Sequence, residues 1–167
     1  IKAVVAQVAA MGTWRSFAAG GNLDAMRLMT EFITQDRIAR YQTSAVNYIP
    51  VVAPEGQPAA LATPDSYEYM TRDLDEAPNW LNNVTIESLE RMLEFDPTAA
   101  IELISPTPLL LVAAENDSLI PISMAREAIN RAGEPKKFMT LPCSHFDVYS
   151  TEPWHSQVLK AEVEWFK

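Results

Sequence analysis

The sequence predicts an α/β fold built on a parallel sheet. Two short runs rich in apolar residues, 109–112 and 137–141, are separated by a stretch with helical periodicity, which is the pattern of a strand, a crossover helix and a second strand. A third run, 1–8, opens the chain and also reads as a strand. With 167 residues and 48% hydrophobic content, the chain is long enough to bury the core that such a sheet needs.

The run Leu109–Val112 is uninterrupted by polar residues, as expected of a strand covered on both faces. It leads into the acidic turn Glu115-Asn116-Asp117. A helix should follow, with Pro121 in its first turn and an apolar face formed by residues 122, 125, 129 and 132. Gly133 stands where a left-handed cap would end this helix.

The second strand, Lys137–Leu141, is ended by Pro142, and His145 follows in the next loop. Parallel strands joined by a crossover helix end at the same edge of a sheet, where open α/β sheets bind their ligands. Asp117 and His145 should therefore lie close together at that edge. Asp117 could instead be an ordinary turn residue, and His145 an ordinary loop histidine. Glu115 is a second candidate for the carboxylate that would lie beside His145.

Between the first strand and the later two, short helical patterns replace the strand pattern. Asn22, Thr63-Pro64-Asp65 and either Asn83 or Thr85 are predicted helix starts, and 51–63 reads as a loop rich in proline and alanine. The sequence thus divides into a core strand (1–9), a helical insertion (10–94) and a C-terminal βαβα segment (95–167). The closing helix should pack on the sheet through a stripe of four apolar residues and leave His155 exposed; the stripe is Trp154, Val158, Ala161 and Trp165.

Two stretches carry a family resemblance. Together they resemble the C-terminal part of an α/β hydrolase. The first has the pattern P-L-L-L-V-A-A-E-N-D-x-x-I-P (108–121), and the second has the pattern L-P-x-x-H-F-D (141–147). In that family a catalytic triad runs in the chain order nucleophile, acid, histidine. The resemblance implies that Asp117 is the triad acid, that His145 is the base, and that no cofactor or metal takes part. It also implies that the insertion is a lid, as in dienelactone hydrolase-like, X-Pro peptidase-like and polyketide-processing members.

The activity expected from this resemblance is that of a serine hydrolase. The substrate would be an ester, thioester, lactone or amide with an apolar acyl part, and Trp14, Trp80 and Phe146 are the candidate substrate-binding residues. No serine of the chain lies in the G-x-S-x-G pattern that carries the nucleophile, and the chain opens directly in a strand. We therefore expect the nucleophile and oxyanion hole on an upstream segment or a second chain.

Two other interpretations stay open at this point. A hydrolase-like body without a nucleophile could bind a hydrophobic small molecule without turning it over. The chain could also be another doubly wound domain in which Asp117 accepts a phosphoryl group. The lack of an acidic cluster after Val8 weakens this last interpretation.

Composition limits the partners. A net charge of −9 argues against binding to nucleic acid or to an anionic membrane, and no run reaches transmembrane length. The single cysteine, Cys143, excludes an internal disulfide and a cysteine-based metal cluster, and two histidines are too few for a multi-histidine zinc site. A glycan on the Asn116 sequon would block the proposed acid, which favours a cytoplasmic location. A homodimer is compatible with the sequence.

Overall fold

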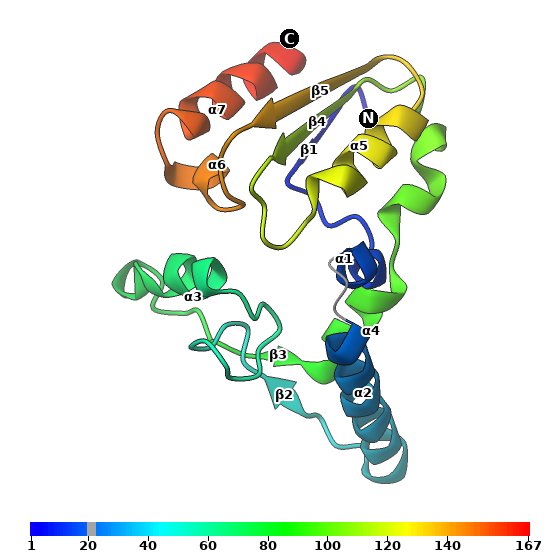
Figure 1. The fold of residues 1–167 in the computed structure, drawn as a ribbon, viewed down its shortest axis with the longest axis vertical. Coiled ribbons are helices and arrows are strands. Elements are labelled where there is room, and N and C mark those ends of the chain that lie inside the picture. Colours follow the sequence, from blue (N-terminus) through cyan, green and yellow to red (C-terminus); the bar gives the residue numbers. More distant parts are fainter. Residues whose placement is uncertain (20–22) are drawn as a thin grey trace.

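The computed structural model describes residues 1–19 and 23–167. It consists of two parts (Figure 1). One part, which we call the body, holds a three-stranded sheet with helices on both faces. The other part, which we call the insert, consists of the described residues of 10–94 and lies below the carboxyl ends of the strands in Figure 1.

The sheet of the body contains β1 (Val4–Gln7), β4 (Leu109–Ala114) and β5 (Lys136–Leu141) in the order β1-β4-β5. Both pairs of neighbouring strands are parallel, with Val4 opposite Leu109 and Ala114 opposite Leu141. Every residue of the central strand β4 is buried. These observations confirm the predicted parallel sheet. The first strand begins at Val4 rather than at Ile1, whose side chain is fully exposed.

Helices cover both faces of β4 because its side chains alternate between them. On one face, Leu109, Leu111 and Ala113 pack against α5 (Ile122–Arg131). On the other face, Leu110, Val112 and Ala114 pack against α6 (Asp147–Ser150) and α7 (Trp154–Trp165). The predicted apolar stripe of the closing helix is confirmed, since all four of its members belong to this second cluster: Trp154, Val158, Ala161 and Trp165.

The ends of α5 differ from the prediction. Pro121 is the cap residue that precedes the helix. Gly133 does not adopt a left-handed conformation, because the helix ends through Ala132 in an extended conformation (φ −58°, ψ 141°). A Cβ atom at position 133 would lie 2.7 Å from the Cβ of Ser105, so glycine is needed for close approach. The ammonium group of Lys136 caps the helix instead, donating to the carbonyls of residues 129 and 132 at 2.8 and 2.7 Å.

The insert contains four α-helices in its described residues: α1 (Thr13–Ala19), α2 (Leu23–Thr43), α3 (Pro64–Thr71) and α4 (Ile86–Glu94). A 3-10 turn, η1 (Leu74–Glu76), and two antiparallel two-residue strands, β2 (Tyr48–Ile49) and β3 (Val84–Thr85), complete it. The chain returns to the body through η2 (Pro97–Ile104), which packs against α5. With 21 residues, α2 is much longer than the short helices predicted. Within the described ranges, no helix combines the length and apolar character needed to span a bilayer.

Two of the three predicted helix starts are described by the structure. Thr85 caps α4, because its hydroxyl accepts a hydrogen bond from the Ser88 amide at 3.0 Å. Thr63 precedes α3, whose first residue is Pro64. Asn22 lies outside the described residues.

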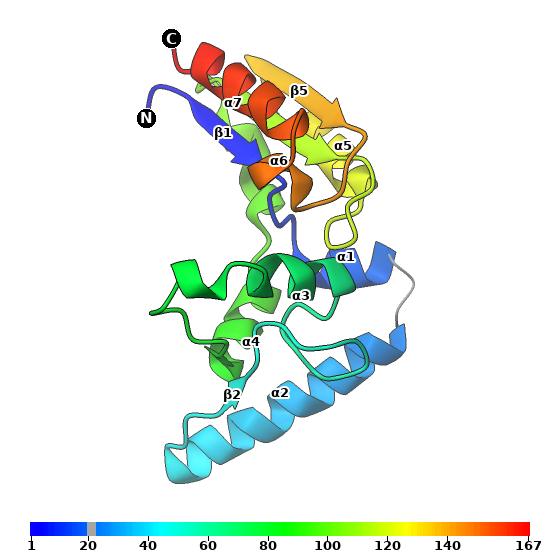
Figure 2. The same cartoon turned by 90° about the vertical axis from the view of Figure 1, so that its left-hand side faces the viewer.

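The insert has a core of its own, which joins α2, α4 and the small sheet. Its buried members are Ile33, Ile49, Ile86, Leu89 and Leu93. A second set of contacts between α2 and α4 is ionic, since the buried carboxylate of Glu90 accepts hydrogen bonds from Arg37 and Arg40. When the molecule is turned by 90° (Figure 2), α3 lies between α2 and the body.

Candidate active site

Asp117 lies in the loop that follows β4, at the carboxyl edge of the sheet. Its side chain is 2% exposed. The Oδ1 atom accepts hydrogen bonds from the backbone amides of Leu119 and Ile120 at 2.8 and 2.7 Å. The loop therefore folds around its own aspartate, and this fixes the direction of the carboxylate. Glu115, the competing acid, is exposed on the same loop.

His145 lies in the loop between β5 and α6. Its Nδ1 atom is 2.8 Å from Oδ2 of Asp117, and its side chain is 12% exposed. The preceding residue, Ser144, donates to Asp147 through both its hydroxyl (2.6 Å) and its amide (2.9 Å). These bonds lower the pKa of Asp147, with the hydroxyl as the largest cause, and they outweigh the opposing effect of burial. These two hydrogen bonds to the Asp147 carboxylate thus hold the loop that carries His145.

The geometry selects one form of the imidazole ring. An ionised carboxylate only accepts hydrogen bonds, so Nδ1 of His145 must carry the proton that is shared with Asp117. In the neutral ring this leaves Nε2 as the acceptor. A histidine in this form can take a proton from a nucleophile, and the buried carboxylate can then stabilise the imidazolium. The structure thus brings together the two residues that the sequence singled out as acid and base.

Phe146, a predicted substrate-binding residue, lies directly beside this pair. Its ring makes an edge contact with His145, with the ring centroids 4.8 Å apart. It also stacks on the ring of Tyr69 in α3, with the centroids 4.5 Å apart, and its centroid lies 6.4 Å from that of Tyr149. The histidine therefore borders an aromatic cluster, which consists of Tyr69, Phe146 and Tyr149.

The two tryptophans predicted to bind substrate lie elsewhere in the insert. Trp14 on α1 is partly buried and packs against the insert core. Trp80 is partly buried in the turn after η1, where its amide donates to the carbonyl of Ala77 at 3.0 Å. Their role in substrate binding stays a prediction.

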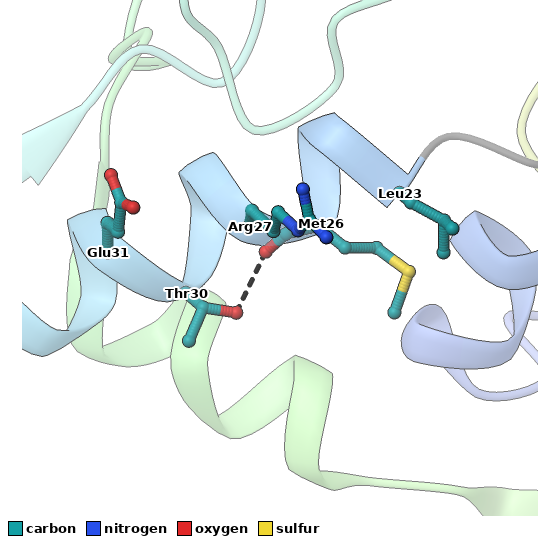
Figure 3. A pocket seen from close by; sticks show the side chains of 5 residues that line it. All are labelled: Leu23, Met26, Arg27, Thr30 and Glu31. Carbon is teal, nitrogen blue, oxygen red and sulfur yellow. Dashed lines mark hydrogen bonds between the residues drawn. The ribbon is translucent and has the colours of Figure 1, made fainter.

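Two of the hollows on the described part of the surface differ in their relation to the site. The larger, of about 380 Å³, lies along the first turns of α2 (Figure 3) and is lined by Leu23, Met26, Arg27, Thr30 and Glu31. It includes neither candidate catalytic residue. The smaller, of about 290 Å³, lies between β1, α6 and α7, and includes Tyr149 of the aromatic cluster together with His155. His155 is partly buried, with Nδ1 3.3 Å from the carbonyl of Val148, so the prediction that it is exposed was wrong.

Cys143 lies two residues before His145, with its side chain buried. Burial raises the pKa of its thiol to about 11, and the negative charges of Asp147 and Asp117 add to the effect. The thiolate is the reactive form of cysteine, so this residue is unsuited to act as a nucleophile at neutral pH. Within the described residues, no group of three histidine, cysteine, aspartate or glutamate side chains is arranged to hold a metal ion.

Comparison with known proteins adds relatives in sequence. No family model matches the chain. The chain is 27% identical over 137 residues to the polyketide transferase ATR5 of Stachybotrys chlorohalonatus (strain IBT 40285), which covers 80% of this chain and 46% of that protein. It is 28% identical over 122 residues to a thiohydrolase of Eupenicillium brefeldianum, covering 70% of this chain and 40% of the relative. The chain therefore spans less than half the length of these curated relatives.

Solved structures with a similar fold were also found. The α/β hydrolase GrgF from Penicillium sp. sh18 superposes with a TM-score of 0.73 at 19% identity, over 99% of this chain and 54% of its own length. DcsB, solved in complex with its substrate analogue, superposes with a TM-score of 0.77 at 20% identity, over 99% of this chain and 56% of its own. The chain therefore has the α/β-hydrolase fold. The predicted resemblance and the predicted fold class are confirmed.

Within this hydrolase fold, three contacts at the site were missed by the sequence analysis. Two of them join α3 to the two loops of the site, through Asp65 and Tyr69, and the third joins Arg72, which follows α3, to Ser150 of α6. Asp65 was noted only as part of a helix start, and Arg72 was not considered. The only signal in the sequence is that positions 65 and 69 are four residues apart and so share one face of α3, with position 72 three residues beyond.

Proposed function

We propose that this chain is the acid- and base-bearing part of a serine hydrolase or acyl transferase of the α/β-hydrolase fold. One observation supports this above all: the 2.8 Å hydrogen bond from Nδ1 of His145 to a carboxylate oxygen of Asp117, whose other oxygen is held by two backbone amides. Such an arrangement holds an imidazole in the form that can act as a general base. The position of the pair at the carboxyl edge of a parallel sheet also fits a catalytic role.

In the proposed mechanism, Nε2 of His145 takes the proton of a serine hydroxyl while the serine oxygen attacks the acyl carbon. The imidazolium is then stabilised by Asp117. When the tetrahedral intermediate collapses, the bond to the leaving group breaks and the imidazolium returns its proton to that group. Water, or the hydroxyl of an acceptor in a transferase, repeats the sequence with His145 as base and releases the acyl group from the serine.

The nucleophile is proposed to come from outside these 167 residues. No serine of the chain lies in G-x-S-x-G, and the raised pKa of Cys143 makes that residue unsuitable. In the described residues, β1 pairs with β4 on one side only, so its other edge can accept a further strand. We propose that an upstream segment or a second chain pairs there and carries the serine and the oxyanion hole. The assembly of this chain with that segment is called the intact protein below.

The proposed substrate is a thioester or ester with an apolar acyl part, with lactones and amides as further candidates. The names of the sequence relatives, a thiohydrolase and a polyketide transferase, support the acyl class. The aromatic cluster beside His145 supports an apolar acyl group, because aromatic rings supply large contact areas with little polar surface. The insert (10–94) is proposed to be the lid over this group, with Trp14 and Trp80 as further candidates for its contacts.

A fluorophosphonate probe, which reacts with activated serines, tests this proposal. The intact protein should gain one label, and peptide mapping should place the label outside residues 1–167. The labelling rate should fall by about 10³-fold in His145→Ala. The matched control is His155→Ala, the other histidine, which should label at the wild-type rate. An intact protein that takes no label would contradict the proposal.

Turnover then defines the substrate class. N-acetylcysteamine thioesters and p-nitrophenyl esters of increasing acyl length should be hydrolysed by the intact protein, with kcat/KM rising with the length of the acyl chain. If the ligands bind with equal affinity to wild type and His145→Ala but neither turns them over, the chain is instead a hydrolase-like binding protein.

A further inference from the structure

Helix α3 contacts both loops that carry the proposed catalytic pair. The loop after β4 and the loop after β5 come from different strands, and the hydrogen bond between Asp117 and His145 joins them. In Figures 1 and 2, α3 lies on the side of the insert that faces α6. Its contacts fall on residues directly next to the acid and the base in sequence.

On the acid side, the contact is a hydrogen bond with a charged group. The hydroxyl of Ser118, the neighbour of Asp117, donates to Oδ2 of Asp65 at 2.7 Å. Burial alone would raise the pKa of Asp65, but hydrogen bonds from the side chains of Thr63 and Ser118 and from the Ser66 amide lower it below the ordinary value. At neutral pH the hydroxyl therefore meets a carboxylate, which makes this the stronger kind of hydrogen bond.

On the base side, the contact is aromatic. The ring of Tyr69 stacks on Phe146, the neighbour of His145, with centroids 4.5 Å apart and an interplanar angle of 17°. Phe146 in turn makes its edge contact with the imidazole ring of His145. Arg72, the residue that follows α3, lies over the Tyr69 ring at 4.7 Å and donates to the hydroxyl of Ser150 in α6 at 3.0 Å. Asp65 and Tyr69 on the helix therefore reach both loops.

We propose that α3 is a positioning element for the Asp117–His145 pair, with Asp65 and Tyr69 as its positioning residues. Asp65 holds the acid loop through Ser118, and Tyr69 holds the base loop through Phe146. Because the short helix connects the two anchor points, its docking fixes the separation of the loops and with it the hydrogen bond between acid and base. This inference rests on the proposed function for its effect on turnover, but not for its effect on the geometry of the pair.

The geometry is tested by NMR on the intact protein. The proton on Nδ1 of His145 should give a low-field resonance, which is assigned by its loss in His145→Gln and its survival in His155→Gln. In Asp65→Ala and in Tyr69→Ala this resonance should weaken through faster exchange with water. Tyr67→Ala is the matched control, because Tyr67 is an exposed tyrosine on the same helix. Tyr69→Phe keeps the stacked ring and should restore the signal.

Kinetics provide the second readout. A misplaced base slows chemistry more than it weakens binding, so kcat should fall by about 10- to 100-fold in Asp65→Ala while KM changes by less than about threefold. In Tyr69→Ala kcat should fall by a similar factor, and KM should rise as well because Tyr69 belongs to the aromatic cluster. Tyr67→Ala and Tyr69→Phe should retain the wild-type kcat. If Asp65→Ala fails to fold, Ser118→Ala removes the same hydrogen bond from the body side. If Asp65→Ala does fold, the double variant with Ser118→Ala should lose no more kcat than either single variant.

The outcomes separate the two proposals. An unchanged Nδ1 resonance in both Asp65→Ala and Tyr69→Ala would overturn the positioning role, as would a loss of the same size in Tyr67→Ala. A wild-type protein without turnover would end the proposed function, while the resonance would still decide whether α3 sets the geometry. A rise in KM alone would mean that α3 only binds substrate, and this would overturn the positioning role as well.

Discussion

The two carboxylate oxygens of Asp117 have different partners: one is paired with His145, and the other accepts amides of the loop that carries Asp117. One oxygen lies 2.8 Å from Nδ1 of His145, and the other accepts two backbone amides at 2.8 and 2.7 Å. The side chain is 2% exposed, so water does not compete for these bonds to any extent. Rotation of the carboxylate would break three hydrogen bonds at once. The aspartate is thereby fixed before any substrate arrives, which is the preorganisation that general-base catalysis requires.

The hydrogen bonds between Ser144 and Asp147, which hold the loop of His145, should make the free energy of unfolding depend on pH. Hydrogen bonds from Ser144 lower the pKa of Asp147 in the folded protein below its unfolded value of about 3.9. The stability that Asp147 contributes is therefore complete above that value, and is lost as the pH falls through the lower pKa of the folded state. Asp147→Asn should cost about 1–2 kcal/mol at pH 7, and the difference from wild type should shrink below about pH 4.

Urea denaturation of the intact protein at pH 7, 5, 4 and 3 measures this difference. Asp75→Asn on η1 is the control, since Asp75 is exposed and its replacement should change the free energy of unfolding by less than about 0.5 kcal/mol. A difference between wild type and Asp147→Asn that stays constant across this range would contradict the account.

Cys143 should be chemically silent in the folded protein. With a pKa of about 11, less than about a thousandth of its thiol is ionised at pH 7.5, and the side chain is buried. Ellman's reagent should therefore react with the chain only after denaturant is added. Cys143→Ala should keep the wild-type kcat, because the thiol takes no part in the proposed chemistry. Rapid labelling of the native protein, or loss of kcat in Cys143→Ala, would argue that this thiol is reactive after all.

The ionic contact between α2 and α4 should be essential to the insert. The side chain of Glu90 is 5% exposed and accepts hydrogen bonds from both Arg37 and Arg40. Burial alone would raise the pKa of Glu90, but the two arginines lower it. Glu90→Ala removes the hydrogen bonds from the partly buried side chain of Arg40 and from Arg37, and should cost about 1.5–3 kcal/mol of unfolding free energy.

Glu94→Ala is the matched control for that variant. Glu94 lies four residues further on α4 and also contacts Arg37, but half of its side chain is exposed, so its loss should cost less than about 1 kcal/mol. Chemical denaturation of the two variants side by side gives the comparison. Equal destabilisation by both would show that burial of the Glu90 pair is unimportant.

The body could be predicted well from local sequence. Leu109–Val112 is apolar on both faces, so it read as a buried strand, and the structure extends it only to Ala114. The proximity of Asp117 and His145 followed, because a parallel crossover brings the ends of β4 and β5 to one edge. The prediction was wrong at Gly133, where the need for glycine comes from Ser105, a residue distant in sequence. A rule based on local capping does not contain that contact.

The insert was harder to predict, because its contacts join positions far apart in sequence. Asp65 and Ser118 are separated by 53 residues, and nothing local marks either as a partner of the other. The ring of Tyr69 stacks on Phe146 across the boundary between insert and body, and no neighbouring residue in the sequence marks it for that contact. Tertiary docking, rather than helix propensity, decides which face of α3 meets the site.

The central claim is that Asp117 and His145 act as one unit in acyl transfer. The most direct test is kcat/KM of the intact protein for a thioester, measured in Asp117→Ala, His145→Ala and the double variant. The account predicts a fall of about 10³-fold or more in His145→Ala, a large loss in Asp117→Ala, and no further loss when both are changed. Losses that multiply in the double variant, or wild-type turnover in His145→Ala, would contradict it.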